Sequence, residues 1–481
     1  MTTQSRKRWI EDWDSEDVAA WEAGGKKIAK RNLIFSIFAE HVGFSVWSIW
    51  SVMVLFMPQN VYHIDAAGKF FLLAVPTLVG SILRIPYTVA TAKFGGRNWT
   101  IFSAVALLVP AALTLYFVQH PETSYTTFLI VAAFAGLGGG NFASSMTNIN
   151  AFYPQRLKGW ALGLNAGGGN IGVPAMQIIG LLVIAFVSKT SPEIVCAIYL
   201  VLCGLAAVGA AIYMDNLANQ QTTLKYMTES FKFSHTWVMA FLYIGTFGSF
   251  IGFSFAFGQV LNINFVASGQ TAPQAVLHAA QIAWLGPLLG SISRPFGGKL
   301  SDKIGGGKVT LFTFVLMMVS AGVLVTAGII DDNDGRPGAS GAVLVTYIVA
   351  FIALFILSGI GNGSTYKMIP SIFEAKSKSL EGKTRLEQAA WSRNMSGALI
   401  GFAGAIGAFG GVLINLVLRQ SYLGADKSAT SAFMVFAAFY VVCAIVTWAV
   451  FLRTPSPKTP ETVEATPAVT GESDDKVSVS V

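Results

Sequence analysis

Residues 84–100 read RIPYTVATAKFGGRNWT, and residues 294–310 read RPFGGKLSDKIGGGKVT. At an offset of 210, Arg84 aligns with Arg294, Lys93 aligns with Lys303, and the Gly-Gly pairs of both stretches coincide. Each match is weak alone, because the chain holds 49 glycines, but their common order makes coincidence a poor explanation. The two stretches therefore indicate an internal repeat of two halves.

The composition is that of a membrane protein. The 481 residues are 53% hydrophobic and 12% charged, with a mean hydropathy of +0.58, whereas soluble domains carry about 25% charged residues. A helix needs about 20 apolar residues to cross a bilayer core of about 30 Å. By that measure the sequence predicts an all-α membrane protein with twelve transmembrane helices in two pseudo-symmetric six-helix halves. The expected spans are 32–56, 68–91, 99–118, 125–153, 160–187 and 194–213, then 236–258, 275–298, 309–330, 341–366, 389–418 and 429–453.

Six spans per half give both halves the same orientation, which is the parallel repeat of the major facilitator fold. The loop at 298–308 also resembles the inner-loop motif of that superfamily, although its first-half counterpart at 93–97 lacks the acidic residue. The expected organisation is an N-terminal segment (1–31), a first half (32–213), a linker (214–235), a second half (236–453) and a disordered tail (454–481).

The basic residues orient the chain. An even number of spans puts both termini on one side, and the loops on that side carry fourteen lysines and arginines against five on the other. Cytoplasmic loops are the ones enriched in Lys and Arg. We therefore expect a multi-pass protein of the cytoplasmic (inner) membrane with both termini in the cytoplasm. The net charge of +7 has the same topological reading and does not predict a nucleic-acid partner.

Arg84 lies deep inside an expected span. It precedes Lys93 by nine residues, which is about 13 Å along a helix and places it near the middle of the bilayer. Arg294 has the same depth by the repeat. An arginine there costs at least about 2.5–3.5 kcal/mol, so each should face the interior and have a partner. Glu40 is the acidic residue well inside a span, and it can neutralise one arginine but not both. The remaining charge predicts an anionic substrate.

The geometry of arginine narrows the kind of anion. Two guanidinium groups present planar forks of N–H donors, which match the edge of a small planar oxyanion. Nothing in the sequence predicts a metal, a cofactor or an enzyme. The three cysteines lack neighbours at metal-ligand spacing, and no nucleophile–base pair stands out.

Several motifs resemble one family. The glycine-rich segments at 163–172 and 401–411 resemble the paired nitrate signature motifs of the nitrate/nitrite porter family of the major facilitator superfamily. The segments at 82–87, 140–146 and 243–254 and the leader at 13–33 look like that family too. The resemblance covers the chain except for its C-terminal tail, and jointly the motifs are specific.

The resemblance implies a substrate site for nitrate or nitrite. Arg84 and Arg294 would hold the anion from opposite halves, with hydrogen bonds from Asn170 and Tyr243. Three phenylalanines would sandwich it and exclude water, namely Phe44, Phe142 and Phe247. The glycines would form mobile helix interfaces, namely Gly163, Gly167, Gly169, Gly172, Gly401, Gly404, Gly407 and Gly410. Plain helix packing is the competing account for each aromatic residue and for many of the glycines.

The coupling mode stays open between two alternatives. Two uncompensated arginines resist closure of an empty site, which favours nitrate/nitrite exchange. Glu40 and His41 depart from the apolar residues of the exchangers in that family and favour nitrate–proton symport, to which we give slight preference. We expect the protein to act as a monomer in the lipid bilayer. The rival readings are a carrier of another small anion and an anion sensor that transports nothing.

Overall fold

The structure is a computed structural model, and it describes residues 8–188, 191–220, 224–333, 341–424 and 427–453. These ranges are almost entirely helical, which confirms the expected all-α class. The expected tail at 454–481 lies outside the described residues.

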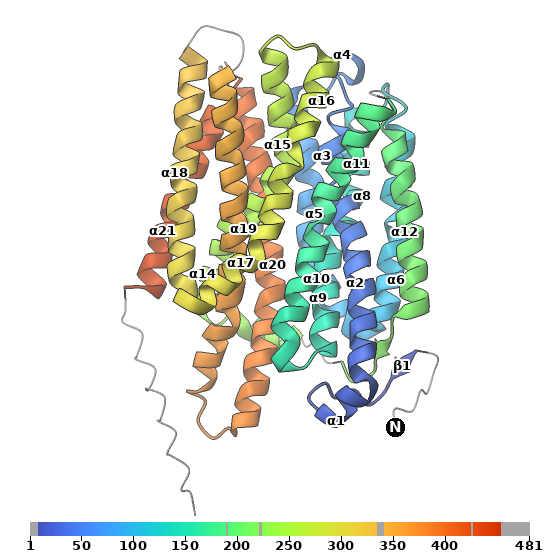
Figure 1. Cartoon of the computed structure of the whole chain (residues 1–481), viewed down its shortest axis with the longest axis vertical. Coiled ribbons are helices and arrows are strands. Elements are labelled where there is room, and N and C mark those ends of the chain that lie inside the picture. Colours follow the sequence, from blue (N-terminus) through green and yellow to red (C-terminus); the bar gives the residue numbers. More distant parts are fainter. Residues whose placement is uncertain (1–7, 189–190, 221–223, 334–340, 425–426, 454–481) are drawn as a thin grey trace, which may run out of the picture.

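The helices form a bundle whose long axis is vertical in Figure 1. The first half contains α2 (Lys26–Trp47), α3 (Ile49–Met53), α4 (Gln59–Tyr62), α5 (Ala66–Phe94), α6 (Gly96–Ala106), α7 (Leu108–Phe117), α8 (Tyr125–Ala135), α9 (Leu137–Phe152), α10 (Gln155–Asn170), α11 (Gly172–Phe186) and α12 (Glu193–Tyr213). Then follow α13 (Leu224–Ser230), α14 (Ser234–Tyr243), a π-helical turn η2 (Ile244–Gly248), α15 (Ser249–Ala267), α16 (Ala272–Ala283), α17 (Leu285–Ile304), α18 (Gly306–Asn333), α19 (Gly341–Ser377), α20 (Arg385–Leu423) and α21 (Thr430–Phe451).

Among the described residues, eleven helical segments are long and apolar enough to cross a membrane. Several consist of two consecutive helices, such as α6 with α7 and α10 with α11. The twelfth span is α2 continued by α3. Its apolar character is diluted by a basic first turn and by Glu40 and His41, but α2 packs along α9, α10 and α12 like the other spans. The twelve-helix fold is therefore confirmed.

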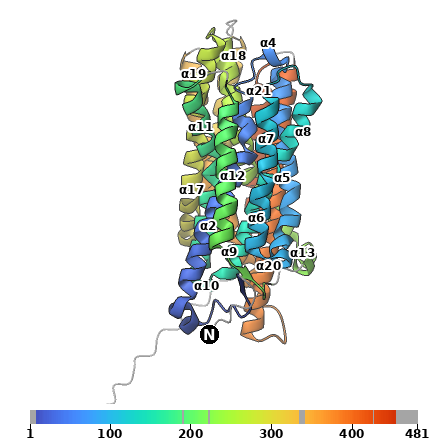
Figure 2. The same cartoon turned by 90° about the vertical axis from the view of Figure 1, so that its right-hand side faces the viewer.

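The two halves lie side by side. In Figure 1 the first-half helices (blue to green) fill the right of the bundle, and most second-half helices (yellow to red) fill the left. Figure 2 shows the same bundle from its right-hand side, with α12 at the front. The halves meet mainly where α5 packs along α20 and where α11 packs against α16. Any site between the halves must lie along these helices.

Glycines of α9 set how closely the first-half helices approach. A Cβ at Gly138 would lie 2.1 Å from the carbonyl oxygen of Gly43 on α2, and one at Gly139 would lie 2.7 Å from Cα of Gly80 on α5. These distances are far below a van der Waals contact, so larger residues would force the helices apart. The glycine run thus brings α2, α5 and α9 into direct backbone contact.

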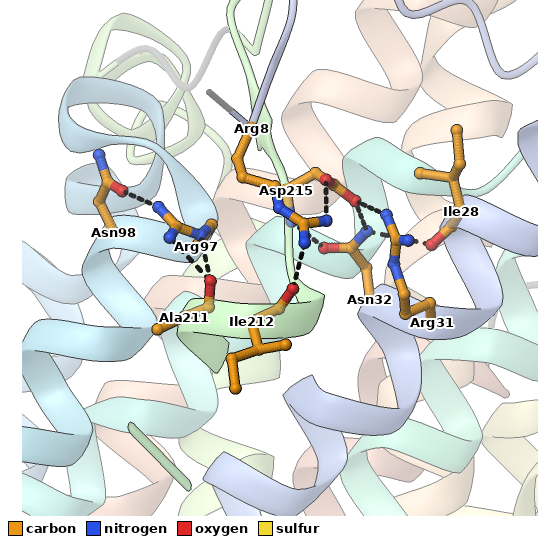
Figure 3. Close-up of polar contacts among 9 residues, drawn as sticks. All are labelled: Arg8, Ile28, Arg31, Asn32, Arg97, Asn98, Ala211, Ile212 and Asp215. Atoms are coloured by element: carbon orange, nitrogen blue, oxygen red, sulfur yellow. Dashed lines mark hydrogen bonds and ion pairs between the residues drawn. The ribbon is translucent and has the colours of Figure 1, made fainter. Parts of the chain in front are cut away.

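A polar clamp (Figure 3) lies beside the chain segment labelled β1, which Figure 1 places at the lower end of the bundle. We call this end the basal end. Asp215 follows α12 and is buried. Its carboxylate accepts hydrogen bonds from Arg31 Nη2 at 2.5 Å and from Asn32 Nδ2 at 3.0 Å, and Arg8 Nη1 lies 3.5 Å from its other oxygen. Asn32 Oδ1 in turn accepts from the Asp215 backbone N–H at 2.9 Å. The clamp therefore ties the start of α2 to the end of α12.

Arg8 and a further arginine, Arg97, satisfy carbonyl groups at the end of α12. Arg8 Nη2 donates to the carbonyl oxygen of Ile212 at 2.5 Å, and Arg97 donates twice to that of Ala211, at 3.1 and 2.8 Å. The last carbonyls of a helix lack partners within it and attract cations. Next to this contact, strand β1 (Trp9–Ile10) pairs in parallel with β2 (Asn216–Leu217). The N-terminal segment is thus fixed to the chain that leaves the first half.

We expect Asp215→Asn to destabilise the protein. The change removes the negative charge and leaves Arg8 and Arg31 facing each other. Loss of one partner from a fully buried ion pair costs about 3–5 kcal/mol. The expected cost here is about 1–3 kcal/mol, because the two arginine side chains remain 32% and 38% exposed. Thermal unfolding of the detergent-purified protein measures it, with the exposed Asp12→Asn as control. An unchanged melting temperature for Asp215→Asn would contradict the clamp.

Candidate functional site

Two buried arginines, one from each half, contact residues of the opposite half. Arg84 on α5 is 0% exposed and Arg294 on α17 is 7% exposed. No carboxylate oxygen of the described residues lies within 4.0 Å of either guanidinium group. Both cations are therefore held in the protein interior without an ion pair, which is costly unless a mobile anion supplies the missing charge.

Backbone carbonyls hold Arg84. Its Nε donates to the carbonyl oxygen of Gly139 at 3.1 Å, and its Nη1 donates to that of Gly404 at 3.0 Å. Gly139 belongs to α9 of the first half, whereas Gly404 belongs to α20 of the second. The side chain therefore bridges the two halves. Its Nη2 is buried and has no hydrogen-bond partner among the described residues.

The Arg294 side chain has one hydrogen-bond partner among the described residues. Its Nη2 donates to Tyr243 Oη at 3.3 Å, while its buried Nη1 finds no partner in the part of the chain that the structure describes. Each arginine thus keeps one terminal nitrogen to which no described residue offers a hydrogen bond. Unsatisfied buried donors of this kind are rare in native proteins and mark a place for a ligand or an ordered water.

Aromatic rings surround the guanidinium groups. Arg84 Cζ lies 4.7 Å from the ring centroid of Phe142, 4.9 Å from that of Phe247 and 6.0 Å from that of Phe44. Phe142 also lies 5.9 Å from Arg294 Cζ, so one ring contacts both cations. The structure therefore brings together the two arginines, Tyr243 and the three phenylalanines of the predicted site.

The π-helical turn η2 explains the placement of Tyr243 and Phe247. Their rings stack at 5.3 Å with an interplanar angle of 14°. A single π turn widens a helix locally, and such turns occur frequently at functional sites. The turn packs closely against α20, where a Cβ at Gly407 would lie 2.5 Å from the Tyr243 ring. The glycine of α20 therefore sets the position of a tyrosine that holds Arg294.

The remaining predicted glycines fall into three groups. A Cβ would meet backbone or an acidic side chain at Gly169, Gly172 and Gly410, at 2.1, 2.2 and 2.8 Å. It would make ordinary or slightly tight contacts at Gly401 and Gly404. At Gly163 and Gly167 nothing lies within 4 Å. Close packing therefore explains why Gly169, Gly172 and Gly410 are glycines, whereas no neighbouring atom explains the glycines at 163 and 167.

Asn170 is a buried amide at the end of the glycine-rich helix α10. It is 1% exposed at the end of α10, and neither its amide oxygen nor its amide nitrogen has a hydrogen-bond partner among the described residues. No hydrogen bond joins it to the arginines in the described structure. A buried amide of this kind can donate to and accept from a small polar ligand.

Glu40 does not pair with an arginine. Its Oε2 accepts hydrogen bonds from Ser145 Oγ on α9 and from Asn165 Nδ2 on α10, the second at 2.7 Å. Its Oε1 is buried without a partner in the described residues. The charges of Arg84 and Arg294 act on the carboxyl group from across the site. The acid therefore occupies a small polar pocket of its own beside the arginines.

His41 follows Glu40 and lies against the same helix, α10. Its Nδ1 is 3.2 Å from the carbonyl oxygen of Gly168. The ring is partly buried, and its backbone carbonyl lies where a Cβ at Gly172 would stand. The histidine contacts backbone rather than the arginines or the aromatic cluster.

Four residues of the site were missed in the sequence. The ring centroid of Trp47 lies 5.4 Å from Arg84 Cζ, and that of Tyr366 lies 5.3 Å from Arg294 Cζ. Ser145 and Asn165 hold Glu40. The repeat offered a signal for two of them. Ser145 follows Asn141 by four residues in the first half, and Tyr366 follows Asn362 by four residues in the corresponding helix of the second half.

Comparisons with known proteins identify relatives of the whole chain. Residues 33–413 match the Major Facilitator Superfamily. The nitrate/nitrite transporter NarU of Escherichia coli (strain K12) is 33% identical over 92% of this chain and 96% of its own length. The "Probable nitrate/nitrite antiporter NarK2" of Thermus thermophilus is 30% identical over 91% and 96%.

A solved structure supports the fold. The crystal structure of the nucleoside transporter NupG superimposes with a TM-score of 0.56 at 15% identity, over 88% of this chain and all of that one. At 15% identity, this similarity shows only the arrangement of the helices. The match to the superfamily and the similarity to NarU assign the chain to a family. The chain belongs to the Major Facilitator Superfamily, and within it to the nitrate/nitrite porter family.

Proposed function

We propose that the protein is a secondary transporter that moves nitrate and nitrite across the membrane by alternating access. One observation carries the proposal: two buried arginines from opposite halves each keep a terminal nitrogen without a partner among the described residues. A planar oxyanion between Arg84 and Arg294 would satisfy both nitrogens and supply negative charge. Because each half contributes one arginine, the bound anion would hold the halves together.

The aromatic rings suit such a substrate. Nitrate and nitrite are flat and weakly hydrated, and Phe44, Phe142 and Phe247 offer flat apolar surfaces around the cations. Excluding water lowers the local dielectric constant, which strengthens the contact between arginine and anion. Asn170 would add a hydrogen bond once the anion is bound. The names of the related transporters support the same substrates.

For coupling we propose nitrate–proton symport. Glu40 is a buried acid one helical turn from Phe44, and it holds no ion pair that would fix its charge among the described residues. Such an acid inside a membrane protein can carry a proton. His41, the next residue of α2, would assist by exchanging protons with Glu40 where α2 packs against α10. The alternative is nitrate/nitrite antiport, which the two uncompensated arginines favour, because an empty site would resist closure.

We further propose that the basal end faces the cytoplasm. The protein is a multi-pass membrane protein, and the excess of Lys and Arg in the loops at that end predicts this orientation in the inner membrane. Both termini would then be cytoplasmic. The protein would work as a monomer, since the proposed substrate site lies within one chain.

Transport in proteoliposomes tests the proposal. Nitrate uptake is compared under an imposed inward proton gradient, with internal nitrite and no gradient, and with neither. Symport predicts accumulation with the gradient alone, whereas antiport predicts uptake only against internal nitrite. Uptake of neither anion in any condition, with binding retained, would leave an anion sensor. Transport of another small anion, without transport of nitrate or nitrite, would show that the substrate is that other anion.

Tyr243→Phe should weaken substrate binding moderately. The phenyl ring keeps the stack on Phe247 but loses the hydroxyl that accepts from Arg294 at 3.3 Å. A hydrogen bond of this kind contributes about 1 kcal/mol, so the half-saturating nitrate concentration should rise about 3- to 10-fold. The exposed Tyr213→Phe serves as control. Unchanged uptake kinetics for Tyr243→Phe would remove the tyrosine from the site.

A further inference from the structure

The pocket around Glu40 is built from three helices. Glu40 comes from α2, Ser145 from α9 and Asn165 from α10. All three side chains are buried, with exposed fractions of 1%, 7% and 0%. Ser145 Oγ and Asn165 Nδ2 both donate to Oε2, and Asn165 Nδ2 also donates to Ser145 Oγ. The two neutral donors stabilise the ionised form of the acid, since a carboxylate accepts hydrogen bonds better than a carboxylic acid does.

Helix α10 supplies both the donor and the space for the acid. Asn165 reaches Oε2 at 2.7 Å. One turn later, Gly169 lies so close to Oε1 that a Cβ there would be 2.1 Å from it. A small shift of α10 relative to α2 would therefore change the hydrogen bonding at both oxygens of Glu40.

The position of α10 depends on how the two halves sit. The helix packs against α17, the second-half helix that carries Arg294. It also carries the expected mobile glycines, and nothing in the described structure lies within 4 Å of a Cβ built at Gly163 or Gly167. A movement of the two halves changes the contact between α10 and α17 and can thereby shift the helix that holds Asn165.

The charged and titratable groups around the acid are few. Arg84 on α5 and Arg294 on α17 act on Glu40 from across the site, and Tyr366 on α19 interacts with it as well. His41, on α2 itself, turns to the carbonyl oxygen of Gly168. None of the four donates a hydrogen bond to Glu40 in the described structure. Among these neighbours in the described structure, the hydrogen bonds to the carboxylate come from Ser145 and Asn165.

We infer that Asn165 and Ser145 are positioning residues for the proton, and that α10 is the element that links proton binding to the movement of the halves. When α10 holds Asn165 against Glu40, the hydrogen bond favours the ionised form of the acid. When α10 moves away, the acid loses this donor and binds a proton more readily. This inference rests on the proposed symport and adds its coupling device.

Asn165→Ala tests the inference through the pH profile of proton-driven nitrate uptake. Loss of one hydrogen bond to a charged acceptor should move the midpoint of that profile upward by about one to two pH units. The control is Asn264→Ala, a half-buried asparagine on α15 whose amide donates only within its own helix. A uniform loss of rate at every pH, with an unmoved midpoint, would reduce Asn165 to a packing residue and overturn the inference.

A second measurement covers a variant that folds poorly. In Ser145→Ala, infrared titration of the protonated carboxyl band assigned to Glu40 by its loss in Glu40→Gln should show the same upward shift. Asn165→Ser, which restores a donor, should return the midpoint part of the way. Proton-driven accumulation that survives in Glu40→Gln would refute the symport itself. Loss in Glu40→Gln together with unshifted midpoints in the Asn165 and Ser145 variants would refute only the inference.

Discussion

Arg84→Lys and Arg294→Lys should each reduce nitrate uptake by roughly 30-fold or more. Lysine keeps the positive charge but carries its donors on a single nitrogen, whereas Arg84 reaches Gly139 and Gly404 through two separate nitrogens and keeps a third for a substrate. Disrupting a buried, hydrogen-bonded charge pair costs about 2–5 kcal/mol, which corresponds to roughly 30- to 3000-fold in affinity. Uptake and binding of nitrate by the purified variants measure the loss.

The two arginines differ in one expected respect. Arg84 also bridges the halves through Gly404, so its replacement should alter the balance between open and closed forms as well as binding. Arg294 donates to Tyr243, which belongs to its own half, and makes no described hydrogen bond to the other half, so its replacement should act mainly on affinity. Arg453→Lys, at the end of α21, is the control. Lysine variants with unchanged half-saturating concentrations would show that the anion binds elsewhere.

Glu40→Gln should abolish nitrate accumulation driven by a pH gradient while leaving nitrate/nitrite counterflow measurable. Glutamine fills the same volume and can still accept a hydrogen bond from Asn165, but it cannot release a proton. The effect should be all-or-none for accumulation because Glu40 is the buried acid of this site. Counterflow depends on the arginines and should persist.

The matched control is Glu374→Gln, an exposed acid on α19 paired with Lys378. It should leave both modes of transport as they are. Accumulation that survives in Glu40→Gln would assign the proton to another group, with His41 as the next to replace. Loss of counterflow together with accumulation would instead make Glu40 part of substrate binding.

The fold was predictable because its signals are local. Apolar runs, basic loops and the repeat of Arg84 and Arg294 depend on neighbouring residues or on comparison of the two halves. The exact helix ends were less predictable, because several helices continue beyond the apolar stretch. For example, α20 spans Arg385–Leu423, whereas its apolar signal suggested 389–418. Nothing in the bilayer requirement ends a helix at the membrane surface.

The partners of Glu40 and Asp215 were not predictable for a physical reason. Ser145 and Asn165 are 105 and 125 residues from Glu40, and nothing in their glycine-rich segments marks them as partners of an acid. Asp215 lies beyond the last apolar residue of its span, where an acid looks like ordinary loop polarity. Their roles arise only when the helices assemble, since each depends on contacts between distant spans. The arginines were identifiable earlier because their burial contradicts their chemistry.

The basal clamp also bears on how the protein is made. Arg31 precedes its partner Asp215 by 184 residues. At roughly 5–20 residues per second, a ribosome needs roughly 10–40 s to reach the partner. Until then the N-terminal arginines stay unpaired, and their free charge can hold the leader on the cytoplasmic side while the first spans insert. Docking onto Asp215 would then mark a completed first half, so nascent chains arrested before Asp215 should keep a protease-sensitive leader that longer chains protect.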